Sequence, residues 1–366
     1  MNVSGTSFLS RGFPVPHALA ISNASVSLSD GVLRMIEVTH HVGSVIPKAW
    51  TTAPIPRTVR GEEKKGSDEI AGILRAVASK QGVKSAVALI HEGDAYAYVV
   101  RMPAAAEEDL HAAVEASLEA NVPIPPTDVI FEYGVVRRDD MRGELVVAVC
   151  AISRHASDAC ADLLHAAGIF PAGLETEARA LARAVIARGD RNTHALLSVM
   201  ERHSVVAVVE RGFVTFSSSI EVGAADLDQA VAKTFSISPE EARALRRTKP
   251  VKKEDVHNNH AREEDVFEAM IPVLSTIRDE LSKVLSFARG QAMKDGSDKD
   301  AAVRDVILCG ADALFPGFSR YIAETSHLPA IAGSAWVNAL SVERHLPELD
   351  RESSMDYAAL IGALIS

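Results

Sequence analysis

The sequence predicts an α/β protein of two lobes that carry a small α+β insert, and three observations lead to this fold class. The 366 residues exceed what one ordinary core accommodates and suit two or three packed units. Two blocks each contain a strand pair with a tight turn, Asp30-Gly31 in the first and Arg211-Gly212 in the second. Between these blocks, short strands and helices follow an order of their own.

Composition narrows the class of protein. Hydrophobic residues make up 47% of the chain and charged residues 24%, which is ordinary for a globular protein. A net charge of -11 argues against nucleic-acid binding, which normally needs a basic face. No apolar run approaches the roughly 18 residues that span a bilayer, and the first residues hold no signal-peptide core. We therefore expect a cytoplasmic protein without direct membrane insertion, so any association with the inner membrane must come through a partner.

The first block predicts two strands at residues 18–28 and 32–38, followed by an exposed loop that holds Pro47, Pro54 and Pro56. A helix with apolar residues at helical spacing follows and ends at Gly82. The spacing of the apolar residues then changes. Residues 85–90 and 95–101 predict a hairpin, 129–136 and 144–152 predict a second strand pair, and a helix follows each pair.

The second block repeats this architecture without matching residues, which predicts two related halves. Its strands are expected at residues 195–199, 204–209 and 213–222, after a short helix at 176–187. Ser238-Pro239-Glu240-Glu241 is a well-formed helix start. A polar loop at 248–262, a long helix near 263–293, a buried strand at 303–308 and a final apolar helix at 357–365 complete the chain.

Several segments together resemble the PilM family, the actin-like component of the type IV pilus platform, and more distantly the FtsA-like division proteins. The resemblance depends on the order and spacing of these segments from residue 18 onwards, because no single motif is decisive. The segments are Arg101-Met102-Pro103, 121–125 (NVPIP), 166–171 (AAGIFP) with Glu175 and 180–183 (ALAR), 220–223, 236–242, 307–318 (ILCGADALFPGF) and 357–364.

This resemblance implies an actin-like, ribonuclease H-like fold of two lobes with an SHS2-type insert. The implied division has an extended or disordered N-terminus at 1–17, a first lobe at 18–84 and 168–192, and an insert at 85–167. The second lobe covers 193–345, and a C-terminal helix at 346–366 returns to the first lobe.

The resemblance also implies an ATP site between two hairpins, each with an Asp for the Mg²⁺ shell and a Gly beside phosphate. In residues 18–27 (ALAISNASVS), Ala20 stands at the Asp position, Ser22 at the Gly position and Ser27 at a Lys position. On the second hairpin, Ser198 replaces Asp and Met200 replaces Gly.

Two further positions of the nucleotide site differ from the family pattern. In the adenosine turn Gly310 is kept but its neighbour is Ala311, and Arg243 and Arg246 stand where Glu and Lys are usual. We therefore expect a degenerate nucleotide site at Ser22, Asn23, Ser198, Gly310 and Ala311, with weak or absent MgATP binding, no resident metal and no catalysis. Asn23, Arg202 and His203 could still offer hydrogen bonds or positive charge.

The resemblance implies an adaptor, a pseudo-ATPase scaffold of the type IV pilus or a related type II secretion platform. Such a protein binds the cytoplasmic tail of a PilN-type membrane protein in an apolar groove beside the insert and couples the platform to its motor. One alternative is an active ATP-dependent switch, which the replaced loop residues oppose. The other is an FtsA-like division protein, which would carry a basic amphipathic extension that residues 357–366 do not show.

Other signals favour ordinary structural roles. His257 and His260 have the spacing of a metal pair, but no third ligand set is evident, so a solvated loop is the preferred interpretation. The basic run at 246–253 is interpreted in the same way. Cys150 and Cys160 lack an activating neighbour, which predicts buried, unreactive thiols.

Overall fold

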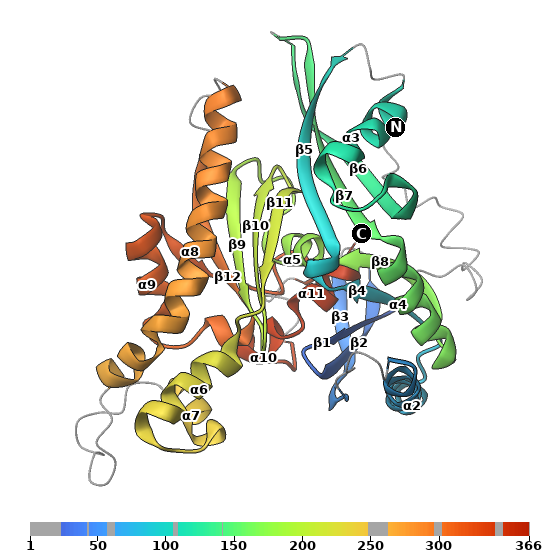
Figure 1. Cartoon of the computed structure of the whole chain (residues 1–366). Helices are drawn as coiled ribbons and strands as arrows, with labels where there is room; N and C mark the ends of the chain where they lie inside the picture. The colour runs from blue at the N-terminus through green and yellow to red at the C-terminus, as the bar shows by residue number, and fades with distance from the viewer. Residues whose placement is uncertain are drawn as a thin grey trace.

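The computed structural model describes residues 23–41, 44–56, 63–104, 109–140, 142–247, 263–295, 302–340 and 347–365 (Figure 1). Two five-stranded sheets have the same strand order, β3-β2-β1-β4-β8 in the first lobe and β11-β10-β9-β12-β13 in the second. This equivalence confirms the predicted α/β architecture of two related halves. None of the described helices is long and apolar enough to cross a bilayer.

The first lobe is built around β1 (Ala24–Ser29), which pairs with β2 (Val32–His41) across the predicted turn. Asp30 and Gly31 both have positive φ, as this tight turn requires. The sheet continues through β3 (Ser44–Pro54), β4 (Ser85–Ile90) and β8 (Phe170–Thr176). Helices α2 (Glu63–Gln81) and α4 (Arg154–Ala166) pack together beside this lobe.

The second lobe has a sheet of five strands and four helices. Its strands are β9 (Thr193–Val199), β10 (Ser204–Glu210), β11 (Phe213–Ile220), β12 (Val303–Cys309) and β13 (Ala330–Ala332). Its helices are α6 (Ala224–Phe235), α7 (Pro239–Arg247), α8 (Glu263–Asp295) and α9 (Phe318–Ser326). The predicted start of α7 is confirmed, because Ser238 and Glu241 bond each other's backbone N–H groups at 3.2 and 2.9 Å.

A third sheet lies between the two lobes in sequence. It is built from β5 (Ala95–Pro103), β6 (Val129–Asp139) and β7 (Glu144–Ser153) in the order β5-β7-β6, and α3 (Leu110–Asn121) precedes β6 in the chain. The expected hairpin of residues 85–90 and 95–101 does not form, because β4 runs parallel between β1 and β8 of the first sheet. Within the predicted insert at 85–167, β4 therefore pairs with the first lobe, and α4 packs on α2.

The segment expected as an exposed loop is largely strand β3, at the edge of the first sheet. An edge strand tolerates proline because one of its sides makes no ladder bonds. Pro47 stands opposite Val38 beside a register shift, and Pro54 is the last residue of the strand. The prolines therefore mark the edge of a sheet. When the sequence is considered alone, the same prolines resemble those of a loop.

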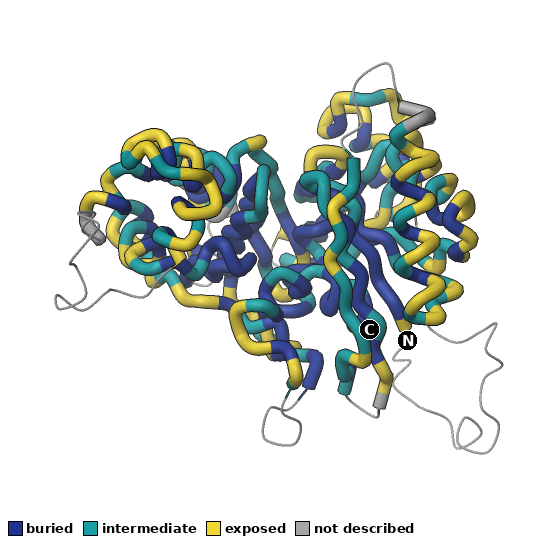
Figure 2. The backbone as a smooth tube through the Cα atoms, turned by 90° about the horizontal axis from the view of Figure 1, so that it is seen from below, coloured by how far each residue is buried: buried dark blue, intermediate teal, exposed yellow. Residues whose placement is uncertain are grey.

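Two short helices join the lobes at the centre of the molecule. Helices α5 (Glu177–Val185) and α11 (Ala358–Ala363) pack against each other, and α10 (Arg351–Met355) precedes α11. One apolar cluster runs from Leu89 in the first sheet through Leu181 and Leu360 to Leu196 in the second. Figure 2 shows buried backbone where the two halves meet and exposed backbone toward the periphery. The lobes therefore share a continuous core beneath the cleft.

Candidate functional site

The two hairpin turns predicted to flank a ligand meet each other directly. Asp30, in the turn between β1 and β2, accepts a hydrogen bond from the backbone N–H of Arg202 at 3.3 Å. Its other carboxylate oxygen lies 2.9 Å from Nδ1 of His203, in the turn between β9 and β10. The space between the hairpins is thus bridged by side chains of the protein itself.

His203 has a second carboxylate partner in the first lobe. Its Nε2 lies 3.0 Å from the Glu177 carboxylate at the start of α5, and its side chain is 0% exposed. Burial alone would lower the pKa of His203, but the hydrogen bonds and charges of Asp30 and Glu177 outweigh it and raise the pKa to about 10. His203 is therefore a buried cation at neutral pH.

A third buried carboxyl, that of Glu92, lies beside this cluster. The Glu92 side chain accepts the Ala178 N–H at 2.9 Å, and the Glu92 N–H faces Glu177 at 3.3 Å. Burial raises the pKa of Glu92 to about 7, and the nearby Glu177 charge acts in the same direction. The ring of His91 is 4.4 Å from that of His203, and its Nδ1 accepts the Gly93 N–H at 3.0 Å.

Two serines from the central strands of the lobes lie at the same small cavity. Ser27 on β1 and Ser198 on β9 both line a cavity of about 20 Å³, together with Arg34 and Met200. The Oγ of Ser198 and Nη1 of Arg34 are buried without a hydrogen-bond partner among the described residues. A cavity of this volume accommodates about one water molecule.

The first hairpin determines which described residues reach the cleft. Strand β1 begins at Ala24, and the Asp30–Gly31 turn fixes its pairing with β2. Ser27, on this strand, shares the small cavity with Ser198, and Ala20 lies outside the described residues. Ser22 lies outside the described residues, and Asn23 is exposed at the end of β1 farthest from the turn. The structure thus brings Ser198 to the cleft but does not bring Asn23 there.

Gly310 and Ala311 lie near Ser198, as the sequence predicts, because β12 is parallel to β9. Gly310 has a φ of 83°, and a Cβ at this position would stand 2.4 Å from the carbonyl oxygen of Val199. Glycine is therefore required both by the backbone conformation and by the close approach of the two strands. The Ala311 N–H donates to the Asp356 carboxylate at 3.4 Å.

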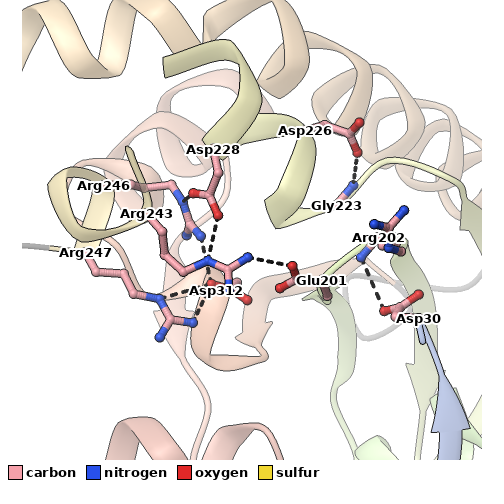
Figure 3. Close-up of polar contacts among 10 residues, drawn as sticks. All are labelled: Asp30, Glu201, Arg202, Gly223, Asp226, Asp228, Arg243, Arg246, Arg247 and Asp312. Atoms are coloured by element: carbon pink, nitrogen blue, oxygen red, sulfur yellow. Dashed lines mark hydrogen bonds and ion pairs between the residues drawn. The ribbon is translucent and has the colours of Figure 1, made fainter. Parts of the chain in front are cut away.

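An arginine cluster fills the side of the cleft formed by α6, α7 and the Gly310 turn (Figure 3). Arg246 is 0% exposed and donates to Asp228 at 2.6 Å and to Asp312 at 2.9 Å. Arg243 joins Asp228 to Glu201 at 2.8 and 2.5 Å. Burial would raise the pKa of Asp312, but Arg246 and Arg247 outweigh it and lower the pKa. The cluster is therefore a fully charged, internally paired network.

The position of Arg246 differs from the one expected from the sequence. Arg246 was expected in a solvated basic run, yet its guanidinium is buried and lies 5.6 Å from the ring centre of Phe315. The run continues into residues 248–253, which lie outside the described residues, as do His257 and His260. Asp228 and Asp312 were missed because they are far from Arg246 in sequence and only the fold brings them together.

The N-terminus of α6 also has its donors satisfied. The N–H groups of Ala224 and Ala225 donate to the carbonyl oxygens of Met200 and Glu201 at 2.9 and 2.8 Å. The Gly223 N–H donates to the Asp226 side chain at 2.9 Å. Free N–H groups at a helix start are what commonly bind phosphate. Here these donors hold the second hairpin turn instead.

The charged groups of the described cleft are paired with one another. A bound nucleotide needs carboxylates to hold the metal's water shell, N–H donors for phosphate and space for a base. Here Asp30 and Glu177 are paired with His203, and Arg246 is paired with Asp228 and Asp312. The cavity that Ser27 and Ser198 line has room for about one water molecule.

A larger hollow lies between the insert and the lobes. It has a volume of about 230 Å³ and is lined by β6, β7, α5 and the start of β11, with Tyr133, Cys150, Arg179 and Phe213 among its residues. Tyr133 is 37% and Phe213 38% exposed, which is high for large apolar side chains. We call this hollow the insert groove. Burial raises the pKa of Cys150 to about 11, which agrees with the predicted unreactive thiol.

Comparisons with known proteins agree with this architecture. The chain is similar to a PilM-PilN type IV pilus biogenesis complex, with a TM-score of 0.72 and 16% identity over 94% of this chain and 98% of the other. It is also similar to EutJ from Carboxydothermus hydrogenoformans (TM-score 0.53, 15% identity, 97% and 92% covered). MreB5 of Spiroplasma citri bound to ADP is a third similar structure (TM-score 0.50, 13% identity, 87% and 94% covered).

The fold is therefore actin-like, as the sequence predicts. No curated protein sequence matches the chain. A model of the family described as type IV pilus assembly protein PilM matches residues 25–359. Because that match spans most of the sequence, this protein belongs to the PilM family of type IV pilus assembly proteins.

Proposed function

We propose that this protein is an adaptor of the type IV pilus platform that binds the cytoplasmic tail of a PilN-type membrane protein and does not depend on nucleotide. The family match and the likeness to a structure described as a PilM-PilN complex support the partner. The cleft supports the independence from nucleotide, because Asp30, Glu177 and His203 occupy the space between the hairpin turns. This ion-paired cleft is the observation on which the proposal rests.

The degenerate cleft predicts that MgATP binds more weakly than about 1 mM. Each missing charge-assisted contact to phosphate removes roughly 1.5–3 kcal/mol, and several are missing. Titration with fluorescent ATP in the presence of Mg²⁺ measures the affinity, with a nucleotide-binding protein of the same fold as the positive control. Saturable micromolar binding would contradict the proposal and favour the ATP-dependent switch.

The insert groove is the proposed docking site for the partner's tail. Its floor is formed by β7, and its rim by Tyr133 on β6 and Phe213 on β11. Gly134 has no side chain, and a Cβ there would stand 2.3 Å from the Phe213 ring, so glycine lets this ring reach across to the insert. Strand β6 is an outer strand of its sheet. Such an edge can pair with an extended peptide while a pocket receives its side chains.

Apolar groups in the tail would gain from this groove because its aromatic rim is partly exposed. Arg179 pairs with Glu132 and Glu175 at 2.9 and 3.3 Å, so the polar wall of the groove has both charges internally balanced. A tail that is mainly aliphatic would therefore fit better than a strongly charged one. Burying each aliphatic side chain is worth about 1.5–3 kcal/mol.

Replacing Tyr133 or Phe213 by alanine is expected to weaken binding of a PilN-type tail peptide about 10–100-fold, as aromatic anchors usually do. Fluorescence anisotropy with the labelled peptide measures the affinity. Ile331→Ala is the matched control, because Ile331 is 47% exposed but belongs to β13 at the outer edge of the second sheet. Equal affinity of the wild type and both groove variants would exclude this docking site.

A further inference from the structure

The imidazole of His203 is held between carboxylates that belong to the opposite lobe. Asp30 comes from the first hairpin turn and Glu177 from the start of α5, whereas His203 is in the second hairpin turn. The ring nitrogens are 2.9 and 3.0 Å from these carboxylates, and the side chain is 0% exposed. A single side chain therefore connects three segments across the cleft.

The hydrogen-bond chemistry defines the charge of this ring. Both nitrogens face a carboxyl group, and an ionised carboxylate only accepts hydrogen bonds, so both nitrogens donate when Asp30 and Glu177 are charged. Only the imidazolium form has two N–H groups, because neutral imidazole presents one lone pair that would point at a carboxylate. The raised pKa of His203 agrees with this assignment.

The other groups around the ring do not supply an alternative cation. The ring of His91 lies 4.4 Å from that of His203 and is tilted by 55°, and Glu92 approaches Glu177 through its backbone N–H. Ligand atoms of His91, Glu177 and His203 lie within 4.8 Å of one another, a spacing that could also suit a metal ion. However, the Gly93 N–H occupies Nδ1 of His91, and both His203 nitrogens already face carboxylates. Metal binding would require His203 and Glu177 to give up their pairing with each other.

We propose that the His203 imidazolium is a built-in interlobe lock, which substitutes for the bound cation and phosphates of a nucleotide and holds the cleft closed. This inference rests on the proposed function, in which the protein does not depend on nucleotide. It adds that the His203 side chain takes the place of the nucleotide between the lobes. A ligand between two lobes stabilises the closed arrangement only while it is bound. A cation that is part of the chain stabilises it permanently, so the surface offered to a partner does not vary with ATP concentration.

The protonation of the lock can be observed in the wild-type protein. In ¹⁵N-histidine NMR spectra at about pH 8.5, ordinary histidines are neutral, whereas the His203 ring should keep both protons. His203→Gln should remove this signal, and Asp30→Asn should shift it if the glutamine variant does not fold. Spectra in which every histidine is neutral at this pH would overturn the proposal.

The contribution of the lock to stability should depend on pH with a defined sign. Because the folded pKa of about 10 is above the ordinary 6.5, the stabilisation is complete below about 6.5 and is lost as pH rises through 10. The urea midpoint of wild type should therefore exceed that of His203→Gln at pH 7, and the difference should shrink toward pH 10. Comparing the two proteins cancels the titration of Glu92, whose raised pKa of about 7 affects both.

Hydrogen exchange tests whether the lock joins the lobes. In His203→Gln, amides of residues 24–34 and 198–206 should exchange about tenfold faster or more, while α8 should stay protected. Unchanged exchange in both hairpins would overturn the interlobe role. A rise in melting temperature on adding Zn²⁺ that His91→Ala abolishes would overturn it in favour of a metal site. Micromolar ATP binding would refute the proposed function, whereas neutral histidines without ATP binding would refute only the lock.

Discussion

Replacing Arg246 by methionine is expected to lower the free energy of unfolding by about 3–5 kcal/mol, because the variant leaves buried carboxylates short of a partner. The Arg246 side chain is 0% exposed, and its partners Asp228 and Asp312 are 2% and 8% exposed. Methionine keeps much of the apolar stem that packs near Phe315, so the loss reports mainly on the charge. Urea unfolding followed by circular dichroism measures it.

Arg243→Met is the matched control for this prediction. Arg243 also pairs with Asp228, at 2.8 Å, but its side chain is 41% exposed, so water can replace the guanidinium. Its loss should cost about 1 kcal/mol or less. If the two methionine variants are equally stable, burial does not govern the cluster and the predicted role of Arg246 is wrong.

Gly362→Ala is expected to destabilise the protein by about 2–4 kcal/mol, since helices α5 and α11 would have to separate. A Cβ at position 362 would stand 1.8 Å from the carbonyl oxygen of Ala180, which is backbone and cannot rotate away. The contact lies within the apolar cluster shared by both lobes. Thermal and urea unfolding should both show the loss.

The same substitution at Gly72 should have the opposite sign. Gly72 is an exposed position of α2, and a Cβ there would meet nothing within 4 Å. Alanine should therefore stabilise the helix by about 0.5–1 kcal/mol through its better helix propensity. A stabilising effect at both glycines would show that α5 and α11 can move apart at little cost.

Local signals predicted much of the fold. The Asp30-Gly31 hairpin, the Ser238 helix cap and the long helix α8 are encoded within a few neighbouring residues, so the sequence was sufficient for them. Strand β4 was assigned to the wrong sheet because its partners, β1 and β8, are distant in sequence. Nothing in residues 85–101 distinguishes a hairpin from a strand that joins a remote parallel sheet.

The candidate site likewise contains some residues that the sequence predicted and others that only the fold brings together. Ser198, Met200 and Gly310 were predicted as site residues from the family resemblance, and they lie at or just after the ends of β9 and β12. Most of the positions predicted at 18–27 fall before β1 begins at Ala24, and Ala20 and Ser22 lie outside the described residues. His203 was noted only as a possible charge, since its partners Asp30 and Glu177 are respectively 173 and 26 residues away. Pairings of this kind become visible only when the chain is folded.

The serine at position 198 has a consequence for how this cleft could change in evolution. Its side chain is 1% exposed and shares its small cavity with Glu177 and Asp356. Burial already raises the pKa of Asp356. An aspartate at 198 would add a third acid group to a space that holds about one water, at a cost that no single compensating substitution removes. Several coordinated changes around this cavity would therefore be needed before it could hold a metal ion.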